Sequence, residues 1–229
     1  MAKRWRWVAV GVLLVGVWAA CSDKNGASKS TSAPQATATK PTKPAKATEP
    51  ATTEKPKPSA TTTGPWYDHY DPAHFAAEVR RFAKPAGINP QLLMAILYAE
   101  SYKPHDPKFE RQWAQVDSDP AFGIANMHKP AFDETKRGRD FAKRRWEELP
   151  DNPALAIEAA AWHLHDLAKR LPAKRAGLYT KDELLALGYN AGGGNMRIFA
   201  RGRKAGSQAQ SYLDRIHKYW ADSAEALKS

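Results

Sequence analysis

The sequence contains one carboxylate whose surroundings suit acid–base chemistry. Glu100 lies near the end of residues 91–102, a stretch that is expected to form a helix. On that helix it shares a face with three earlier aliphatic residues, Leu93, Ile96 and Leu97. Burial on that face favours the neutral carboxyl and raises its pKa, and the negative end of the helix dipole acts in the same direction. Glu100 is therefore a candidate general acid near neutral pH, unless it bends into water or pairs with an arginine.

Other chemistry-bearing patterns are weaker. His163 and His165 are two positions apart, a spacing that does not put two ligands on one helix face. Because the sequence has no His-Glu-x-x-His or Cys-x-x-Cys pattern, we expect no metal and no cofactor. Three of the eight tryptophans are candidates for stacking on sugars, although most tryptophans are expected to be packing residues: Trp113, Trp146 and Trp162.

Four sequence blocks, taken in order, resemble the soluble lytic transglycosylases, a goose-lysozyme-like family. Residues 92–101, Leu-Leu-Met-Ala-Ile-Leu-Tyr-Ala-Glu-Ser, resemble the family helix that ends in a catalytic Glu-Ser pair. Residues 122–128, Phe-Gly-Ile-Ala-Asn-Met-His, resemble its Gly-Leu-Met-Gln segment, and residues 154–167 fit its next long helix. Residues 188–192, Gly-Tyr-Asn-Ala-Gly, resemble its Tyr-Asn-Ala-Gly motif, and Tyr212 falls where the family has a closing tyrosine helix. The resemblance covers residues 73–220.

This resemblance implies an all-α, lysozyme-like fold and cleavage of peptidoglycan strands between N-acetylmuramic acid and N-acetylglucosamine. Glu100 would protonate the glycosidic oxygen and then accept a proton from the muramyl 6-hydroxyl, which closes onto C1 as a 1,6-anhydro ring. Ser101 would hydrogen-bond the carboxyl, and Tyr189 would lie near Glu100 or the N-acetyl group, positioned by Asn190. The residues that the resemblance assigns to substrate binding or support are Ser101, Gly123, Asn126, Tyr189, Asn190, Ala191, Gly192 and Tyr212.

The sequence departs from the family pattern in two places, which leaves two alternatives open. Asn126 stands at the family's Gln position. Its side chain is shorter than that of Gln, which puts in doubt the contact that the family's Gln makes with the substrate. The interval from Glu100 to Asn126 is long, which suggests an inserted loop at residues 103–120. One of its aspartates could be a second carboxylate, giving a hydrolytic muramidase like goose-type lysozyme: Asp106, Asp117 or Asp119. The other alternative is a peptidoglycan-binding lipoprotein without turnover.

The elements that would position these residues are helices with recognisable starts. Three pairs place a capping side chain directly before a proline, namely Asp71-Pro72, Asn89-Pro90 and Asn152-Pro153. Thr180 and Glu183 have the spacing of a capping box. The expected helices include residues 91–102, 154–171, 184–190 and 208–226. No segment shows the alternation of a strand, and residues 103–120 read as a long loop.

The first 21 residues predict export. Residues 1–7 are basic and residues 8–20 are apolar, a run too short to span a membrane and typical of a signal peptide over residues 1–20. Residues 17–21, Val-Trp-Ala-Ala-Cys, resemble a bacterial lipoprotein cleavage box, although Trp18 departs from the usual aliphatic residue. Cys21, the only cysteine, would then be acylated and form the mature N-terminus, a membrane anchor for a protein in the cell wall.

Composition divides the rest of the chain. Residues 22–65 are rich in Thr, Ala, Pro, Lys and Ser and predict a disordered linker, which leaves residues 66–229 as one helical domain. The formal charge of the chain is +11, but its signs alternate over the expected domain. We therefore expect anionic wall or membrane partners rather than nucleic acid, and a monomer.

Overall fold

The computed structural model describes residues 65–68 and 70–229. The predicted signal peptide, the lipidation site Cys21 and the linker up to residue 64 lie outside the described residues. Within the described part of the chain, no helix has both the length and the apolar character needed to cross a membrane.

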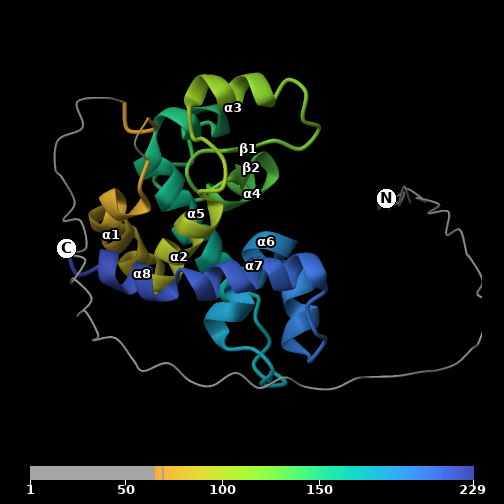
Figure 1. Ribbon diagram of the computed structural model, residues 1–229. Helices are drawn as coiled ribbons and strands as arrows, with labels where there is room; N and C mark the ends of the chain where they lie inside the picture. Colours follow the sequence, from red (N-terminus) through yellow and green to blue (C-terminus); the bar gives the residue numbers. More distant parts are fainter. Residues whose placement is uncertain (1–64, 69) are drawn as a thin grey trace, which may run out of the picture. The chain divides into compact units, whose positions relative to one another are not determined.

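Helices dominate the described residues, which confirms the all-α prediction (Figure 1). In chain order the elements are η1 (Pro72–Phe75), α1 (Ala76–Ala86), α2 (Pro90–Glu100), α3 (Pro107–Trp113), β1 (Ala121–Phe122), β2 (Met127–His128), α4 (Lys129–Thr135), η2 (Trp146–Asp151), α5 (Pro153–Lys169), α6 (Lys181–Ala200), α7 (Ser207–Lys218) and α8 (Trp220–Ala226).

Helix α2 lies at the centre of the packing. It contacts α1, α6, α7 and α8, and Figure 1 shows α7 and α8 following one another beside it. Residues 92–97 have no exposed surface, so the helix is buried on nearly all sides rather than on one face. The spacing of apolar residues in the sequence predicted a single apolar face on this helix, which is less burial than the structure has. As a result, the last residue of α2, Glu100, is inside the domain, where neighbouring elements decide its environment.

The predicted helix starts are confirmed by their hydrogen bonds. Asp71, Asn89 and Asn152 accept backbone N–H groups at the starts of η1, α2 and α5, at 2.9–3.0 Å. Thr180 Oγ1 accepts the Glu183 N–H at 3.2 Å, and the Glu183 carboxylate accepts the Thr180 N–H, which completes the capping box. Each cap satisfies backbone donors that a helix start would otherwise leave free.

The predicted loop at residues 103–120 contains a helix. Asp106 caps α3 by accepting the Phe109 N–H at 2.6 Å, and Pro107 occupies its first position. This is the same cap-and-proline device as at the three predicted starts, so the helix was predictable from the sequence. Strands β1 and β2 also differ from prediction, but two-residue strands are too short to show alternation.

Two helix ends differ from the prediction as well. The last helix, predicted as residues 208–226, is two helices separated at Tyr219, whose φ of −94° and ψ of 4° are not helical. Helix α6 extends well beyond residue 190 to Ala200, because the chain resumes helical geometry after Gly192. Gly192 itself has φ 83° and ψ 156°, a conformation open mainly to glycine.

Candidate active site

Glu100 lies in a cleft where four parts of the chain meet. Only 7% of the residue is exposed. The cleft has a volume of about 430 Å³ and is lined from the end of α2, from α3, from the β1–β2 hairpin and from α6. Lining residues beside Glu100 include Tyr102, Trp113, Asn126, Tyr189 and Asn190. A carboxyl in such a place is shielded from bulk water but accessible to a ligand in the cleft.

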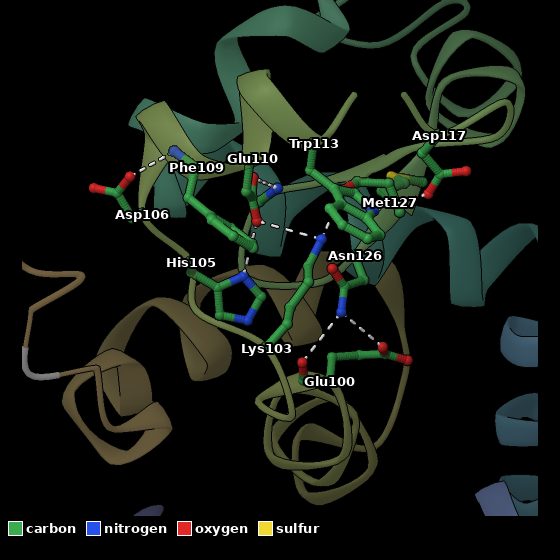
Figure 2. Close-up of polar contacts among 12 residues, drawn as sticks. Glu100, Lys103, His105, Asp106, Phe109, Glu110, Trp113, Asp117, Asn126 and Met127 are labelled. Atoms are coloured by element: carbon green, nitrogen blue, oxygen red, sulfur yellow. Dashed lines mark hydrogen bonds and ion pairs between the residues drawn. The ribbon is translucent and has the colours of Figure 1, made fainter. Parts of the chain in front are cut away.

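Both oxygens of the Glu100 carboxyl receive a hydrogen bond. The Tyr212 hydroxyl on α7 donates to Oε1 at 2.9 Å. Asn126 Nδ2 donates to Oε2 at 3.0 Å and also to the Glu100 backbone carbonyl at 3.1 Å (Figure 2). The carboxyl is therefore held from two sides, by elements 26 and 112 residues further along the chain.

Burial is the largest influence on Glu100 and raises the pKa of its carboxyl. The hydrogen bonds from Asn126 and Tyr212, and the charges of Arg215 and His105, lower the pKa and offset part of this effect. The net shift is upward, so the carboxyl keeps its proton to a higher pH than an exposed glutamate. This is the property that a general acid needs near neutral pH.

Asn126 reaches Glu100 because of an unusual backbone turn between β1 and β2. Gly123 has φ 74°, and a Cβ there would lie 2.9 Å from the Leu149 carbonyl oxygen, so only glycine fits. Asn126 itself has φ 45°, a left-handed conformation that asparagine tolerates better than most residues. Its N–H closes the turn by donating to the Gly123 carbonyl at 2.9 Å. The substrate contact of Asn126 that the family pattern implies stays a prediction; in the structure its amide N–H group contacts Glu100.

The predicted hydrogen bond from Ser101 to the carboxyl is not formed, and Tyr189 lies in the cleft near Glu100 without bonding it. The Ser101 hydroxyl donates to the Tyr98 carbonyl at 2.7 Å, because the end of α2 offers free carbonyl groups. The Tyr189 hydroxyl donates to the Ala125 carbonyl at 2.6 Å, inside the β1–β2 turn. Tyr212 is therefore the tyrosine that bonds Glu100 directly, and Tyr189 contacts the turn that carries Asn126.

The remaining predicted residues of α6 lie at the junction of two cavities. Tyr189 and Asn190 line the cleft, and Asn190 and Ala191 line a second cavity beside it. The break at Gly192 follows directly and changes the direction of the helix at this point. Of the predicted support residues, Asn126, Tyr189 and Asn190 line the cleft, whereas Ser101 bonds within its own helix end. Gly123 accepts the Asn126 N–H with its carbonyl group, and Tyr212 bonds Glu100 from below the surface.

A buried ion cluster that the sequence analysis missed braces the cleft wall. Glu110 on α3 is 2% exposed and accepts the Gly123 N–H at 2.8 Å. His105 Nδ1 lies 3.0 Å and Lys103 Nζ 3.5 Å from its Oε1 (Figure 2). Glu110 therefore ties α3 to the turn that presents Asn126. The Asp106 cap is the one sequence signal that could have placed Glu110 on a helix. Knowledge of that helix would then have shown which neighbouring residues share a face with Glu110.

The three aspartates proposed as second carboxylates occupy different positions. Asp117 and Asp119 line the cleft with Glu100, whereas Asp106 caps α3. Asp117 accepts the Trp113 Nε1–H at 3.1 Å, and Asp119 Oδ1 lies 3.1 Å from His128 Nδ1. Two carboxylates besides Glu100 are thus accessible to a ligand, and Asp106 is committed to the helix start.

One of the three candidate tryptophans lies at the cleft. Trp113 is 55% exposed and lines the cleft, stacked against Phe109 with ring centroids 6.3 Å apart and planes 15° apart. Trp146 is buried against Phe122, and Trp162 is partly buried below the Arg139 guanidinium. Trp113 and Phe109 therefore provide an accessible aromatic surface, of the kind that stacks on sugar rings. No group of three or more metal-ligating side chains occurs among the described residues.

The comparison with models of protein families gives a match to this chain. The family model described as Transglycosylase SLT domain matches residues 79–212. The match covers more than half of the 229 residues and includes Glu100, the β1–β2 turn, all of α6 and Tyr212. No curated protein shows a significant match to the chain.

Proposed function

Because the chain belongs to the transglycosylase SLT domain family, we propose that it is a lytic transglycosylase with Glu100 as catalytic acid and base. Family membership confirms the lysozyme-like fold class and supports, in general, a peptidoglycan glycosidase activity of the lytic-transglycosylase type. The assignment of Glu100 is supported by one observation above all. Glu100 has a buried carboxyl in the cleft; the pKa of this carboxyl is raised, and both of its oxygens accept hydrogen bonds.

The proposed reaction uses Glu100 twice. Its protonated carboxyl donates to the oxygen that joins N-acetylmuramic acid to N-acetylglucosamine, and the C1–O bond breaks. The resulting carboxylate then accepts the proton of the muramyl 6-hydroxyl, whose oxygen bonds to C1 and forms the 1,6-anhydro ring. Between these steps Glu100 carries a negative charge, which the Asn126 and Tyr212 hydrogen bonds stabilise.

A hydrolytic muramidase is the second candidate, favoured by Asp117 and Asp119. Both line the cleft that contains Glu100, and neither is buried. A second carboxylate could activate water to attack C1 in place of the 6-hydroxyl. The product would then carry a reducing end, so the two candidates differ by one water in product mass.

The proposed location is outside the cytoplasm. The basic and apolar segments before Cys21 support export, and the residues around Cys21 support a lipid anchor. An anchored or secreted enzyme would meet peptidoglycan directly, which agrees with the substrate of the family.

The first test compares the full chain with its Glu100→Gln variant on purified peptidoglycan, with soluble products identified by mass spectrometry. We expect the wild type to release muropeptides one water lighter than the reducing forms. The variant should lose at least ~10²–10⁴ in rate, the usual contribution of general acid–base catalysis. Glu147→Gln is the matched control, because Glu147 is exposed and does not line the cleft.

The Gln variant should remain folded. Its amide oxygen can accept from Asn126 Nδ2, and its amide N–H can donate to the Tyr212 hydroxyl oxygen. It also avoids the cost of an ionised carboxyl in a buried place, so its melting temperature at pH 7 should equal or exceed that of the wild type. Rapid turnover by the folded variant would refute the role of Glu100, and reducing ends would identify a muramidase. Binding without release by the wild type would instead identify a non-catalytic wall-binding protein.

A further inference from the structure

A second cavity lies beside the cleft, between the end of α6 and the start of α7. Its volume is about 1030 Å³, and Asn190 lines both cavities, so the two adjoin at this residue. Five of its lining residues carry neutral amide or hydroxyl groups, namely Asn190, Asn195, Ser207, Gln208 and Ser211. Amides and hydroxyls both donate and accept hydrogen bonds, which suits a ligand that contains peptide groups.

Arg215 is the one charged residue among those that line this second cavity. Its guanidinium carbon lies 5.1 Å from the centre of the Tyr212 ring, and stacking on that ring restricts its orientation. Its Nε is buried and has no hydrogen-bond partner among the described residues, and Arg215 forms none of their ion pairs. A partly buried guanidinium without an ion-pair partner is suited to a carboxylate, which its planar fork can bind at two points.

The chain segment that supplies most of this cavity's lining is basic up to Asp214, the neighbour of Arg215. Residues 184–213, which include most of its lining, contain no Asp or Glu. Four exposed cations lie in that segment: Arg197, Arg201, Arg203 and Lys204. Their combined field attracts an anionic ligand toward Arg215 and disfavours a cationic one.

We propose that the second cavity binds the stem peptide of the peptidoglycan strand, with Arg215 paired to a peptide carboxylate. The proposal rests on the proposed function, since the strand must lie in the cleft for its peptide to reach the cavity. The stem peptide hangs from the lactyl ether of N-acetylmuramic acid, the sugar whose C1 bond Glu100 would cleave. A peptide leaving that sugar on the Asn190 side of the cleft would meet the second cavity, which adjoins the cleft at that residue. The protein should therefore prefer peptide-bearing strands to bare glycan.

The test measures kcat/KM on two substrates: peptidoglycan with intact stem peptides, and the same glycan strands after an amidase has removed the peptides. Full chains are compared as wild type, Arg215→Gln, Arg215→Lys and Lys218→Gln. Lys218 is exposed on the same helix and lines neither cavity, so its substitution controls for the loss of one charge. The ratio of interest is kcat/KM on peptide-bearing strands divided by kcat/KM on peptide-free strands. We expect Arg215→Gln to lower this ratio ~10-fold or more, the range of a charge-assisted hydrogen bond.

The ratio matters because Arg215 also affects the Glu100 carboxyl, and that effect is the same for both substrates. Lys keeps the charge but not the fork, so Arg215→Lys should restore the ratio in part. An unchanged ratio in Arg215→Gln, or an equal change in Lys218→Gln, would overturn the proposal.

A binding measurement separates this proposal from the proposed function. Calorimetry with a soluble wall tetrapeptide should show binding that falls ~10-fold in Arg215→Gln, and similarly when the peptide carboxylates are converted to amides. If the wild type cleaves neither strand but binds the peptide through Arg215, the proposed function fails and the peptide site stands. If the wild type cleaves both strands with the same kcat/KM, and binds the tetrapeptide no better than its amide form, the peptide site fails alone.

Discussion

The carboxyl of Glu100 experiences two opposing influences, and both come from the way the chain surrounds it. Burial at the end of a central helix raises its pKa, whereas donors from Asn126 and Tyr212 stabilise its charged form. An acid that must give up its proton and take another benefits from both. The first makes the proton available near neutral pH, and the second prevents the conjugate base from becoming prohibitively unstable.

Tyr212→Phe tests this balance at a single atom. The substitution removes the hydroxyl that donates to Glu100 Oε1 and keeps the ring. Because that hydrogen bond lowers the pKa of Glu100, its loss should raise the pKa. The proposed acid acts in its protonated form, so the alkaline limb of the pH profile of kcat/KM should move to higher pH. The measurement is kcat/KM on solubilised glycan strands from acid to alkaline pH.

Tyr189→Phe is the matched control for this shift. Tyr189 is a tyrosine of the same cleft, but its hydroxyl donates to the Ala125 carbonyl rather than to Glu100. Its loss can reduce the rate by loosening the turn, yet it should leave the position of the alkaline limb unchanged. A shift of the limb to lower pH in Tyr212→Phe would contradict the assigned direction of the hydrogen-bond effect.

At the residue scale, the sequence identified which residues gather but not how they bond. Glu100, Asn126, Tyr189 and Tyr212 were all predicted for one site, and they do lie together. The resemblance assigned the carboxyl contact to Ser101 and placed Tyr189 near Glu100 or the N-acetyl group, whereas in the structure Asn126 and Tyr212 contact the carboxyl. Which of two nearby hydroxyls reaches an oxygen depends on backbone positions at the ångström level, and a motif does not contain that information.

Helix α3 is the element that braces the site. Glu110 extends from it to the Gly123 N–H and to the side chains of His105 and Lys103, of which His105 is buried and Lys103 partly exposed. The same glycine begins the turn that carries Asn126. Stability of the α3 segment and geometry of the candidate acid should therefore be linked.

Glu110→Ala should lower the free energy of unfolding by about 3 kcal/mol, because it leaves a buried N–H and a buried imidazole without their acceptor. Asp106→Ala, which removes only the cap of the same helix, should cost about 1 kcal/mol. Urea denaturation of both variants measures the difference. Equal and small losses would show that the buried cluster does not brace the cleft wall.

At the element scale, the helix-capping rules predicted correctly the helix starts to which they were applied. The caps at Asn89, Asn152 and Thr180 set the starts of α2, α5 and α6 as predicted. The failures were at α3, whose identical Asp-Pro signal lay in a stretch rich in loop-forming residues, and at Tyr219 and Gly192, where helices break or resume. Such breaks are decided by tertiary packing around the segment, which outweighs the weak preferences of single residues.

The whole molecule combines a helical domain with a long N-terminal segment of different composition. The domain carries the cleft, and its substrate is an insoluble polymer that cannot diffuse to the enzyme. If residues 22–65 form the disordered linker that their composition predicts, about 40 residues in extended, proline-rich form would reach on the order of 100 Å. An anchor at Cys21 followed by such a linker would let the domain search the wall while it remains attached to the membrane.

Cys21→Ala tests that arrangement without touching the domain. In cells labelled with a radioactive fatty acid, the wild type should carry the label and sediment with membranes. The variant should carry none and appear in the soluble extracytoplasmic fraction, because no other cysteine is present to be acylated. Its activity on purified peptidoglycan should match the wild type, since Cys21 lies outside the family match and the cleft. An unlabelled wild type would exclude the anchor and leave simple secretion, whereas a variant inactive on purified wall would show that the N-terminal segment contributes to catalysis itself.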